Sequence, residues 1–367
     1  MNSVFSISTA LYVAFLAWVL QGLKAILARE AKKPEPVSNQ AISIIVAARN
    51  EEHNLPSLLD SLSKLNYHSD MYEIIIVNDH SEDNTAKLLD SYKGCPNLRI
   101  IHFYEETPPL TGKKAALNQG ILAATNDILA FTDADCLLPQ NWLIEINHSM
   151  DAETDYLLAY SIMKRQPDGS TFRSRNFERS VYYALAAAGL HYHRPITSSA
   201  CNMVYRKSLF EKSGGWEGIG HLRSGDDDLL LMKMMPQIRK AAYNPSPDMQ
   251  VVSIDGTDAK QHHQTNIRRA SKLRYYPLWL KLMSIGVFSY FCLFYYALIK
   301  SLTGKGGLGL AAILLTKTAA EFSLVFYHLK KINHAELSWL YPVQIFLFPA
   351  QFIFYALRGS LGKYRWK

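Results

Sequence analysis

The segment I-L-A-F-T-D-A-D at residues 128–135 is an apolar run that ends abruptly in two carboxylates. This pattern is typical of a buried strand that brings Asp133 and Asp135 to the carboxyl edge of a sheet, where open α/β folds place their ligands. Two acids on either side of one small residue suit Mg²⁺ or Mn²⁺, which are commonly held by carboxylates together with a substrate's phosphates. A capped turn with solvated acids would give the same short motif, so the interpretation depends on the rest of the chain.

Strand and helix patterns alternate before this segment. Residues 42–48 form a β-branched apolar run of the kind buried in a parallel sheet, and leucines at helical spacing follow between residues 55 and 65. Two more strand patterns lie at 73–77 and 99–103, and two more helix patterns lie at 85–92 and 113–124. Strands that alternate with helices predict βαβ units, and therefore an α/β fold with a doubly wound sheet.

Three of the predicted strands end in polar clusters. The clusters are Asn50 with Glu51, Asn78 with Asp79 and Asp83, and Asp133 with Asp135. Each cluster alone could be turn or helix-cap chemistry, but three that converge on one sheet edge indicate a ligand site. The sequence has no G-x-G-x-x-G after its first strand and no G-x-x-x-x-G-K-[ST], so the usual dinucleotide and P-loop cradles are excluded. A metal held by carboxylates would bind a diphosphate in another way.

Six motifs, in order and spacing, resemble those of family-2 glycosyltransferases with the GT-A fold. They are A-R-N-E-E at 48–52, I-I-V-N-D-H-S-E-D-N-T at 75–85, G-K-K-A-A-L-N at 112–118, T-D-A-D at 132–135, S-S-A-C-N-M-V-Y-R-K at 198–207, and G-G-W at 214–216 followed by S-G-D-D-D-L-L-L at 224–231. The resemblance covers about residues 40–275. It implies a Rossmann-like, doubly wound mixed sheet over residues 40–258, a nucleoside diphosphate sugar as donor, with uridine as the expected base, and Mn²⁺ or Mg²⁺ as cofactor.

The resemblance also implies roles for single residues. Asp79 would read the nucleotide base, Asp133 would lie near the ribose and diphosphate, and Asp135 would coordinate the metal together with Asp133. The other residues expected to line the donor pocket are Ala47, through its backbone, Glu51 and Lys113. Asn202 belongs to the loop that resembles the acceptor side of the family.

The catalytic acid pair of the family falls on Asp226 and Asp227, with Asp227 as the expected base and Asp226 and Asp228 as alternative alignments. An acceptor hydroxyl must lose its proton as it attacks the anomeric carbon, and a nearby carboxylate is a suitable general base. One base opposite the leaving group implies inversion, whereas glycoside hydrolysis would need two carboxyl groups across the bond. Acids before a helix starting at Leu229 would also be favoured by the helix dipole alone.

One motif departs from the pattern of membrane-bound members. Many of these carry Q-x-x-R-W, whereas this chain reads Q-T-N-I-R-R-A-S-K at 264–272. Arg268 matches the arginine that contacts the diphosphate, Arg269 replaces the tryptophan, and Gln264 lies one residue early on the acceptor side. That tryptophan helps bind the acceptor in processive polymerases, so its absence weighs against polymer extension. Residues 259–281 also fit a basic interfacial segment that meets anionic lipid.

The apolar residues gather at both ends of the chain. Residues 4–27 could cross a bilayer within an N-terminal anchor at 1–30, and the basic residues follow this stretch, which places the next part in the cytoplasm. A C-terminal membrane region at 282–358 contains three more apolar segments, at 282–299, 308–326 and 337–357. With four crossings the basic tail, Arg358, Lys363, Arg365 and Lys367, would lie outside, against the same rule. Two alternatives follow from the sequence: either the rule fails here, or one segment is re-entrant, in which case we expect it to be the one that contains Lys317 and Glu321.

Composition agrees with a membrane enzyme in a reducing compartment. The net charge of +7 is concentrated next to apolar segments, which favours membrane lipids and not nucleic acid as the partner. The four cysteines form no C-x-x-C pair, which argues against zinc and disulfides. We therefore expect a hexosyltransferase of the bacterial inner membrane with a lipid-linked or glycan acceptor at the cytoplasmic face. The alternatives are a processive polysaccharide synthase and a non-catalytic subunit that binds nucleotide sugars.

Overall fold

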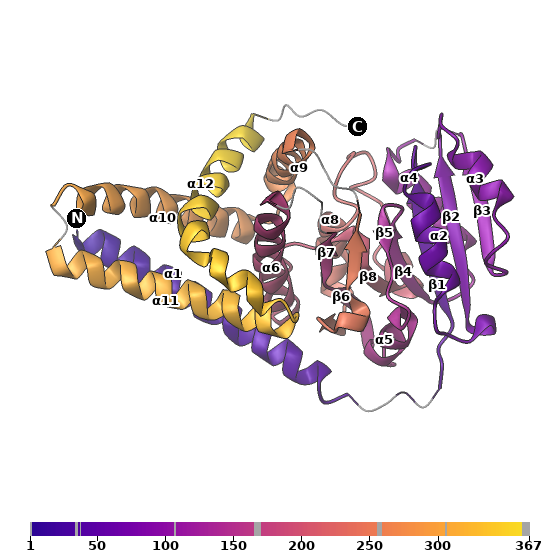
Figure 1. Ribbon diagram of the computed structural model, residues 1–367, viewed down its shortest axis with the longest axis horizontal. Coiled ribbons are helices and arrows are strands. Elements are labelled where there is room, and N and C mark those ends of the chain that lie inside the picture. Colours follow the sequence, from indigo (N-terminus) through magenta and orange to yellow (C-terminus); the bar gives the residue numbers. More distant parts are fainter. Residues whose placement is uncertain are drawn as a thin grey trace. The chain divides into compact units, whose positions relative to one another are not determined.

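The computed structural model describes residues 2–33, 36, 38–105, 108–164, 170–254, 259–304 and 307–361 (Figure 1). The chain divides into two compact units. The first, called here the sheet unit, comprises Lys24–Phe172 and Gly189–Gly256. The second, the helical unit, comprises Met1–Leu23, Arg173–Ala188 and Thr257–Lys367.

The sheet unit is built on a seven-stranded mixed sheet with the order β3-β2-β1-β4-β8-β6-β9. Its strands are β1 (Ile42–Ala48), β2 (Tyr72–Asp79), β3 (Leu98–Phe103), β4 (Ile128–Asp133), β6 (Thr154–Ala159), β8 (Met203–Arg206) and β9 (Lys240–Asn244). Strand β8 runs antiparallel to β4 and β6, and the other paired strands are parallel. A smaller sheet joins β5 (Cys136–Leu137), β10 (Val251–Ser253) and β7 (Ser161–Met163). The predicted doubly wound mixed sheet is confirmed.

Helices cover both faces of the sheet because alternate residues of its central strand are apolar on both sides. In β1, Ile44 and Val46 belong to the core cluster that also contains the leucines of α2 (Leu55–Ser63). On the other face, Ile45 meets α4, where a Cβ atom added to Gly120 would lie 2.6 Å from Ile45 Cγ2. Glycine therefore permits the close approach of α4 to the sheet. The remaining helices of this unit are α3 (Thr85–Ser91), α4 (Lys113–Ala123), α5 (Trp142–Ser149), α7 (Lys207–Lys212) and α8 (Asp228–Met234).

The strand order reverses next to β1. This strand lies between β2 and β4, and its residues pair in parallel with both. Ala47 is in register with Asp133, and Ala48 is in register with Asn78. The polar residues that follow the three strands therefore reach one edge at the switch point of the sheet, which is where open α/β folds bind their ligands.

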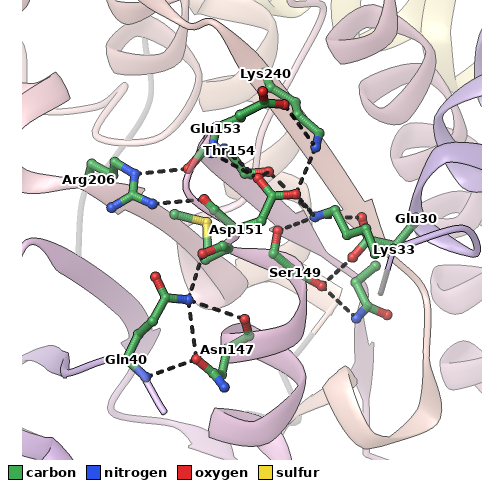
Figure 2. A network of polar contacts seen from close by, with 12 residues as sticks. Glu30, Lys33, Gln40, Asn147, Ser149, Asp151, Glu153, Thr154, Arg206 and Lys240 are labelled. Carbon is green, nitrogen blue, oxygen red and sulfur yellow. Dashed lines mark hydrogen bonds and ion pairs between the residues drawn. The ribbon is translucent and has the colours of Figure 1, made fainter. Parts of the chain in front are cut away.

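A polar network ties the end of α1 (Asn2–Glu30) to the sheet unit (Figure 2). The Lys33 ammonium is almost fully buried, donates to the Ser149 carbonyl and lies 3.1 Å from Glu30 Oε2 and 3.6 Å from Asp151 Oδ2. The hydroxyl of Ser149 donates to Glu30, and Lys240 Nζ lies 2.7 Å from Asp151 Oδ2. Burial alone would raise the pKa of Asp151, but the bonds from Lys240 and Thr154 and the charge of Lys33 lower it.

We expect Asp151→Asn to lower the free energy of unfolding by about 1–2 kcal/mol, because Lys33 and Lys240 both lose a charged partner. The folded-state pKa of Asp151 is lowered, so its contribution is present above the unfolded-state pKa and is lost as pH falls. The gap between wild type and variant should therefore narrow below about pH 4. Urea unfolding from pH 7 to pH 3 measures it. Glu153→Gln, on a mostly exposed side chain, is the matched control and should change little.

The helical unit contains the long apolar helices. Its elements are most of α1, then α6 (Ser170–His191), whose middle lies in this unit, α9 (Ala259–Ser271), α10 (Leu278–Leu302), α11 (Gly307–Lys331) and α12 (Tyr341–Ser360). Among the described residues, four stretches are long and apolar enough to cross a membrane, Val4–Glu30, Leu278–Leu302, Gly307–Lys331 and Ala335–Ser360. Each contains one of the predicted apolar segments. Of the basic tail, Lys363, Arg365 and Lys367 lie outside the described residues.

The charged residues inside α11 form an ion pair. Lys317 Nζ lies 2.8 Å from Glu321 Oε2, and the Lys317 side chain is fully buried, with its ammonium 4.2 Å from the centre of the Phe294 ring. Glu321 also accepts hydrogen bonds from the hydroxyls of Tyr12 at 2.8 Å and Tyr341 at 3.1 Å. These contacts offset the cost of placing charge among apolar helices. The helix is continuous from Gly307 to Lys331 through this pair.

Candidate active site

Two predicted donor-site residues and one predicted catalytic acid meet at the carboxyl edge of the sheet. Asp133 is the last residue of β4, and Lys113 is the first residue of α4. The Lys113 ammonium forms an ion pair with Asp133 Oδ1 and lies 3.8 Å from Asp226 Oδ2. Burial alone would lower the pKa of Lys113, but the negative charges of Asp133 and Asp226 raise it well above its ordinary value. One cation therefore joins the D-x-D motif to the predicted catalytic acid pair.

The three consecutive acids at 226–228 have different surroundings. Asp226 is the one beside Lys113. Asp227 is half-buried and caps α8, and its Oδ1 accepts a hydrogen bond from the Asp228 amide at 2.7 Å. Asp228 is 2% exposed, and its Oδ1 accepts from the Leu229 amide at 2.8 Å. Burial makes Asp228 the least accessible of the three to an acceptor, which favours Asp226 or Asp227 as the base.

The loops after β1 and β2 are fastened to each other. Asn50 N donates to Ser81 Oγ at 3.0 Å, and Glu82 N donates back to Asn50 Oδ1 at 2.8 Å. Glu51 N donates to Thr85 Oγ1 at 2.8 Å. These reciprocal bonds hold the backbone that carries Glu51 next to the loop that follows Asp79.

Asp79 itself is almost fully buried at the end of β2. Its Oδ1 lies 2.7 Å from His80 Nδ1. The next acid, Asp83, accepts hydrogen bonds from the Thr85 and Glu52 amides. Burial would raise the pKa of Asp83, but these bonds lower it. Both predicted strand-end clusters are therefore ordered by local hydrogen bonds at the edge that carries Asp133.

Residues 43–214 match the family model described as Glycosyl transferase family 2. This segment belongs to glycosyl transferase family 2. It is 38% identical over 114 residues to a probable glycosyltransferase of Sulfolobus acidocaldarius, a match over 31% of this chain and 24% of the relative. It is also 38% identical over 109 residues to the dolichyl-phosphate beta-glucosyltransferase of Dictyostelium discoideum, over 27% of this chain and 32% of the relative. The chain thus spans about a quarter to a third of the length of these curated relatives.

The fold of the family 2 domain is also seen in a solved structure. The chain is similar to the mannosyltransferase PcManGT from Pyrobaculum calidifontis, in complex with GDP-Man and Mn²⁺, with a TM-score of 0.56. The similarity covers 95% of this chain and 99% of that one at 20% identity, and it shows the fold alone. The GT-A fold expected from the motifs is confirmed.

The donor atoms in the family 2 domain fit a divalent cation. One ligand atom from each of Asp133, Asp135 and Cys136 lies within 4.8 Å of the others. The two carboxylates are half-buried and offer oxygen, which Mg²⁺ and Mn²⁺ prefer, whereas the thiol is fully buried and belongs to the apolar core. Cys136 Sγ lies 3.5 Å from Asp135 Oδ1 as a hydrogen-bond donor. Asp133 and Asp135 are therefore the residues that would hold the metal.

Asn202, expected on the acceptor side, is a core residue of the family 2 domain. It is fully buried, and its Nδ2 donates to the Tyr160 carbonyl at 2.9 Å and to the Met249 carbonyl at 2.6 Å. Its Oδ1 accepts from Trp142 Nε1 at 3.1 Å. All the polar atoms of its amide are used within the protein. Any effect of Asn202 on an acceptor would therefore act through the position of its loop.

The remaining predicted residues, Gln264, Arg268 and Arg269, lie on α9 in the helical unit. Arg269 Nη1 donates to Asn266 Oδ1 on the same helix at 3.4 Å. Their roles toward the diphosphate and the acceptor stay predictions.

Sequence reasoning missed Lys114, which fixes the loop before the catalytic acids. Its side chain is 1% exposed, and its Nζ donates to the carbonyls of Leu222 at 2.5 Å and Ser224 at 2.7 Å. A second bond, from Thr111 N to the Gly220 carbonyl at 3.1 Å, holds the same loop. From one helix start, Lys113 therefore pairs with the acids Asp133 and Asp226, while Lys114 holds the backbone of the loop before residue 226. The only signal in the sequence is a second lysine directly after Lys113 at the start of the helix pattern.

We expect Lys114→Met to lower kcat for sugar transfer about tenfold, with the donor KM changed little, because about 1.4 kcal/mol of lost positioning corresponds to one factor of ten. Lys114→Arg, which keeps the charge, should recover part of the rate. Steady-state release of nucleoside diphosphate measures both parameters, and Lys64→Met, on an exposed helix position, is the matched control. If Lys114→Met and Lys114→Arg instead lowered the melting temperature equally and lowered kcat equally, the role of Lys114 would be structural and not one of positioning.

Proposed function

We propose that the protein is an inverting, metal-dependent glycosyltransferase. It moves a sugar from a UDP-linked donor to a lipid-linked or membrane-proximal acceptor at the cytoplasmic face of the bacterial inner membrane. One observation carries the proposal: the Lys113 ammonium lies against Asp133 and 3.8 Å from Asp226, at the switch point of the sheet. One side chain, that of Lys113, therefore lies between the acid expected near the donor's diphosphate and the acid pair expected to activate the acceptor.

The residues divide into two roles in this reaction. Asp227 accepts the proton of the acceptor hydroxyl as its oxygen attacks the anomeric carbon. The bond between that carbon and the phosphate oxygen breaks, and the nucleoside diphosphate leaves with the bonding electron pair. A bound divalent cation supplies Lewis-acid stabilisation of the diphosphate. Lys113 adds a positive charge beside the same group, and attack from the side opposite the leaving group inverts the configuration.

Two observations support a lipid-linked acceptor. In the part of the chain that the structure describes, four stretches are long and apolar enough to cross a membrane. One relative of the family 2 domain is a dolichyl-phosphate beta-glucosyltransferase, whose name gives a lipid phosphate as its acceptor. An acceptor carried in the bilayer would explain why a nucleotide-sugar enzyme is joined to membrane helices. The basic residues that follow Val4–Glu30 favour the cytoplasmic side for the family 2 domain.

The test is release of nucleoside diphosphate by the purified full-length protein in lipid nanodiscs. A panel of UDP-linked and GDP-linked sugars would be offered with Mn²⁺, Mg²⁺ or EDTA, with and without an extract of membrane lipids. We expect release from a UDP-linked sugar that needs metal and increases with the extract. NMR of the product gives the anomeric configuration, and retention would contradict the single-base mechanism.

The same assay separates the alternatives. A processive synthase would give a ladder of products that lengthens with time, whereas a single addition gives one product. Donor binding without release under every condition would indicate a non-catalytic subunit. Preference for a GDP-linked sugar would overturn the choice of base but not the reaction class.

A further inference from the structure

The C-terminal helix α12 is anchored to polar helices at both of its ends. At its start, Trp339 in the preceding turn lies under the guanidinium of Arg173, 5.7 Å from the ring centre to Cζ. Gln344, in the first turns of α12, donates to Ser174 Oγ at 2.7 Å and is 3% exposed. Both partners belong to α6. A charged guanidinium cannot lie in the hydrocarbon without a large cost, so the start of α12 is at a membrane surface.

The other end of α12 packs on α9. A Cβ atom added to Gly359 would lie 2.5 Å from Ala270 Cβ and 2.9 Å from the Ser271 amide, so the two helices touch without a side chain between them. One turn earlier, the His263 ring lies 5.6 Å from the Tyr355 ring. Among its described residues, α9 carries Gln264, Arg268 and Arg269 and has a strongly polar composition. The end of α12 is therefore also at a membrane surface.

Helices α6 and α9 lie on the same side of the membrane. His262 Nε2 of α9 lies 3.8 Å from Glu178 Oε2 of α6, so the two helices are in contact. Neither is among the stretches long and apolar enough to cross a membrane. Both are connected in sequence to strands of the sheet unit, which contains most of the family 2 domain, α6 after β7 and α9 after β10. The start and the end of α12 are therefore on the side that carries the family 2 domain.

Between its ends, α12 crosses the membrane helices and does not run beside them. It meets α10 at Phe291, Phe294 and Tyr295, which span little more than one turn. Pro349 lies within α12 at this crossing, where it removes one backbone hydrogen bond and favours a kink. Figure 1 shows α12 running across α10 and α11 and ending beside α9. Although α12 is apolar enough to span a membrane, its path therefore begins and ends on the side of the family 2 domain.

We propose that α12 is an apolar lipid-binding surface seated in the leaflet on the side of the family 2 domain, and that it does not cross the bilayer. Its partner is the acyl chains of that leaflet. The exposed apolar side chains on it are Val343, Phe346, Leu347, Phe354, Leu357 and Leu361. The basic residues Arg268, Arg269 and Arg358 lie on or next to the α9 end, where they complement anionic headgroups.

This arrangement resolves the charge imbalance found in the sequence. If α1, α10 and α11 are the crossings among the described helices, α12 ends on the side of the family 2 domain. Arg358, in the last turn of α12, then joins Lys24, Arg29, Lys330 and Lys331 on that same side. Among the described ends of the crossing helices, those of α1 and α11 carry two or more basic residues. Both ends then lie on the side of the family 2 domain, as the positive-inside rule requires.

Cysteine labelling in sealed membrane vesicles of both orientations tests the path. The background is full-length Cys292→Ser, because Cys292 is the exposed one of the four cysteines. Three variants of this background, which keeps the buried Cys95, Cys136 and Cys201, would each carry one added cysteine: Glu153→Cys in the family 2 domain, Thr303→Cys between α10 and α11, or Lys363→Cys in the tail. We expect a membrane-impermeant maleimide to label Lys363→Cys together with Glu153→Cys, and to label Thr303→Cys only from the opposite side.

Labelling of Lys363→Cys together with Thr303→Cys would overturn the proposal, and so would labelling of all three from one side. Depth is measured independently with nitroxide labels at Trp339→Cys, Leu347→Cys and Leu361→Cys in nanodiscs of neutral and anionic lipid. A helix seated in one leaflet places the label at 347 deepest and the other two near one surface. A depth that changes steadily from 339 through 347 to 361 and ends at the far surface would show that α12 spans. Neither result depends on the proposed sugar transfer.

Discussion

Asp227→Asn is expected to lower kcat for sugar transfer by about 10² to 10⁴-fold while donor binding is kept, because general bases contribute rate enhancements of this order. Asparagine is nearly isosteric and can still accept the hydrogen bond that Asp227 Oδ1 receives from the Asp228 amide, so the cap of α8 is preserved. It cannot take a proton from an acceptor hydroxyl. The measurement is single-turnover transfer with a saturating donor, beside calorimetric titration of the donor.

The neighbouring acids provide the matched comparison. Asp226→Asn removes one charge beside Lys113 and should raise the donor KM more than it lowers kcat. Asp228→Asn changes a residue that is 2% exposed and should mainly lower the melting temperature. Asp60→Asn, an exposed acid on α2, should leave all parameters unchanged. Full turnover in Asp227→Asn with loss in Asp226→Asn would contradict our assignment and transfer the base role to Asp226.

Asp135→Asn is expected to abolish metal binding at the D-x-D motif and to lower transfer by about 10² to 10³-fold, the cost of losing one preorganised charge-stabilising group. Asp133 already shares its charge with Lys113, so Asp135 supplies the carboxylate that is least committed to that ion pair. The Mn²⁺ spectrum measured by electron paramagnetic resonance reports binding directly, without any turnover. We expect Mn²⁺ to remain free in the variant.

A separate control addresses folding of this variant. The carboxylate of Asp135 accepts a hydrogen bond from the Cys136 thiol, and asparagine keeps an oxygen for that bond. The melting temperature should therefore stay close to that of the wild type. Wild-type Mn²⁺ affinity in Asp135→Asn would place the metal elsewhere, and unchanged transfer in EDTA would remove the metal from the mechanism.

Much of the sheet could be predicted from sequence because its central strands are buried on both faces. The run at 42–48 is apolar at nearly every position and became β1 with the same limits. The acids after 128–132 lie at the expected edge because parallel strands in register must end together. The family motifs located these residues, and local hydrogen bonds such as Glu82 N to Asn50 Oδ1 reinforce their placement.

Other features depend on contacts between distant residues and leave little mark on the sequence. Lys114 donates hydrogen bonds to the carbonyls of Leu222 and Ser224, which lie 108 and 110 positions further along the chain. Asn202 forms hydrogen bonds with Trp142 and Met249. Both looked like surface or ligand residues because lysine and asparagine are mostly exposed. The neighbours of α12 were equally hidden, since its composition alone fits a span, and contacts such as those of Gly359 and Gln344 are seen in the structure alone.

The buried Lys33 has a practical consequence for studying the family 2 domain apart from its membrane helices. Glu30 and Lys33 precede the first strand, yet their charged groups are satisfied by Ser149 and Asp151. A soluble fragment that starts at the first strand would leave those partners exposed and Asp151 with one lysine fewer. A fragment that starts at Lys24 keeps both residues and should be the more soluble and more stable starting point for crystallisation.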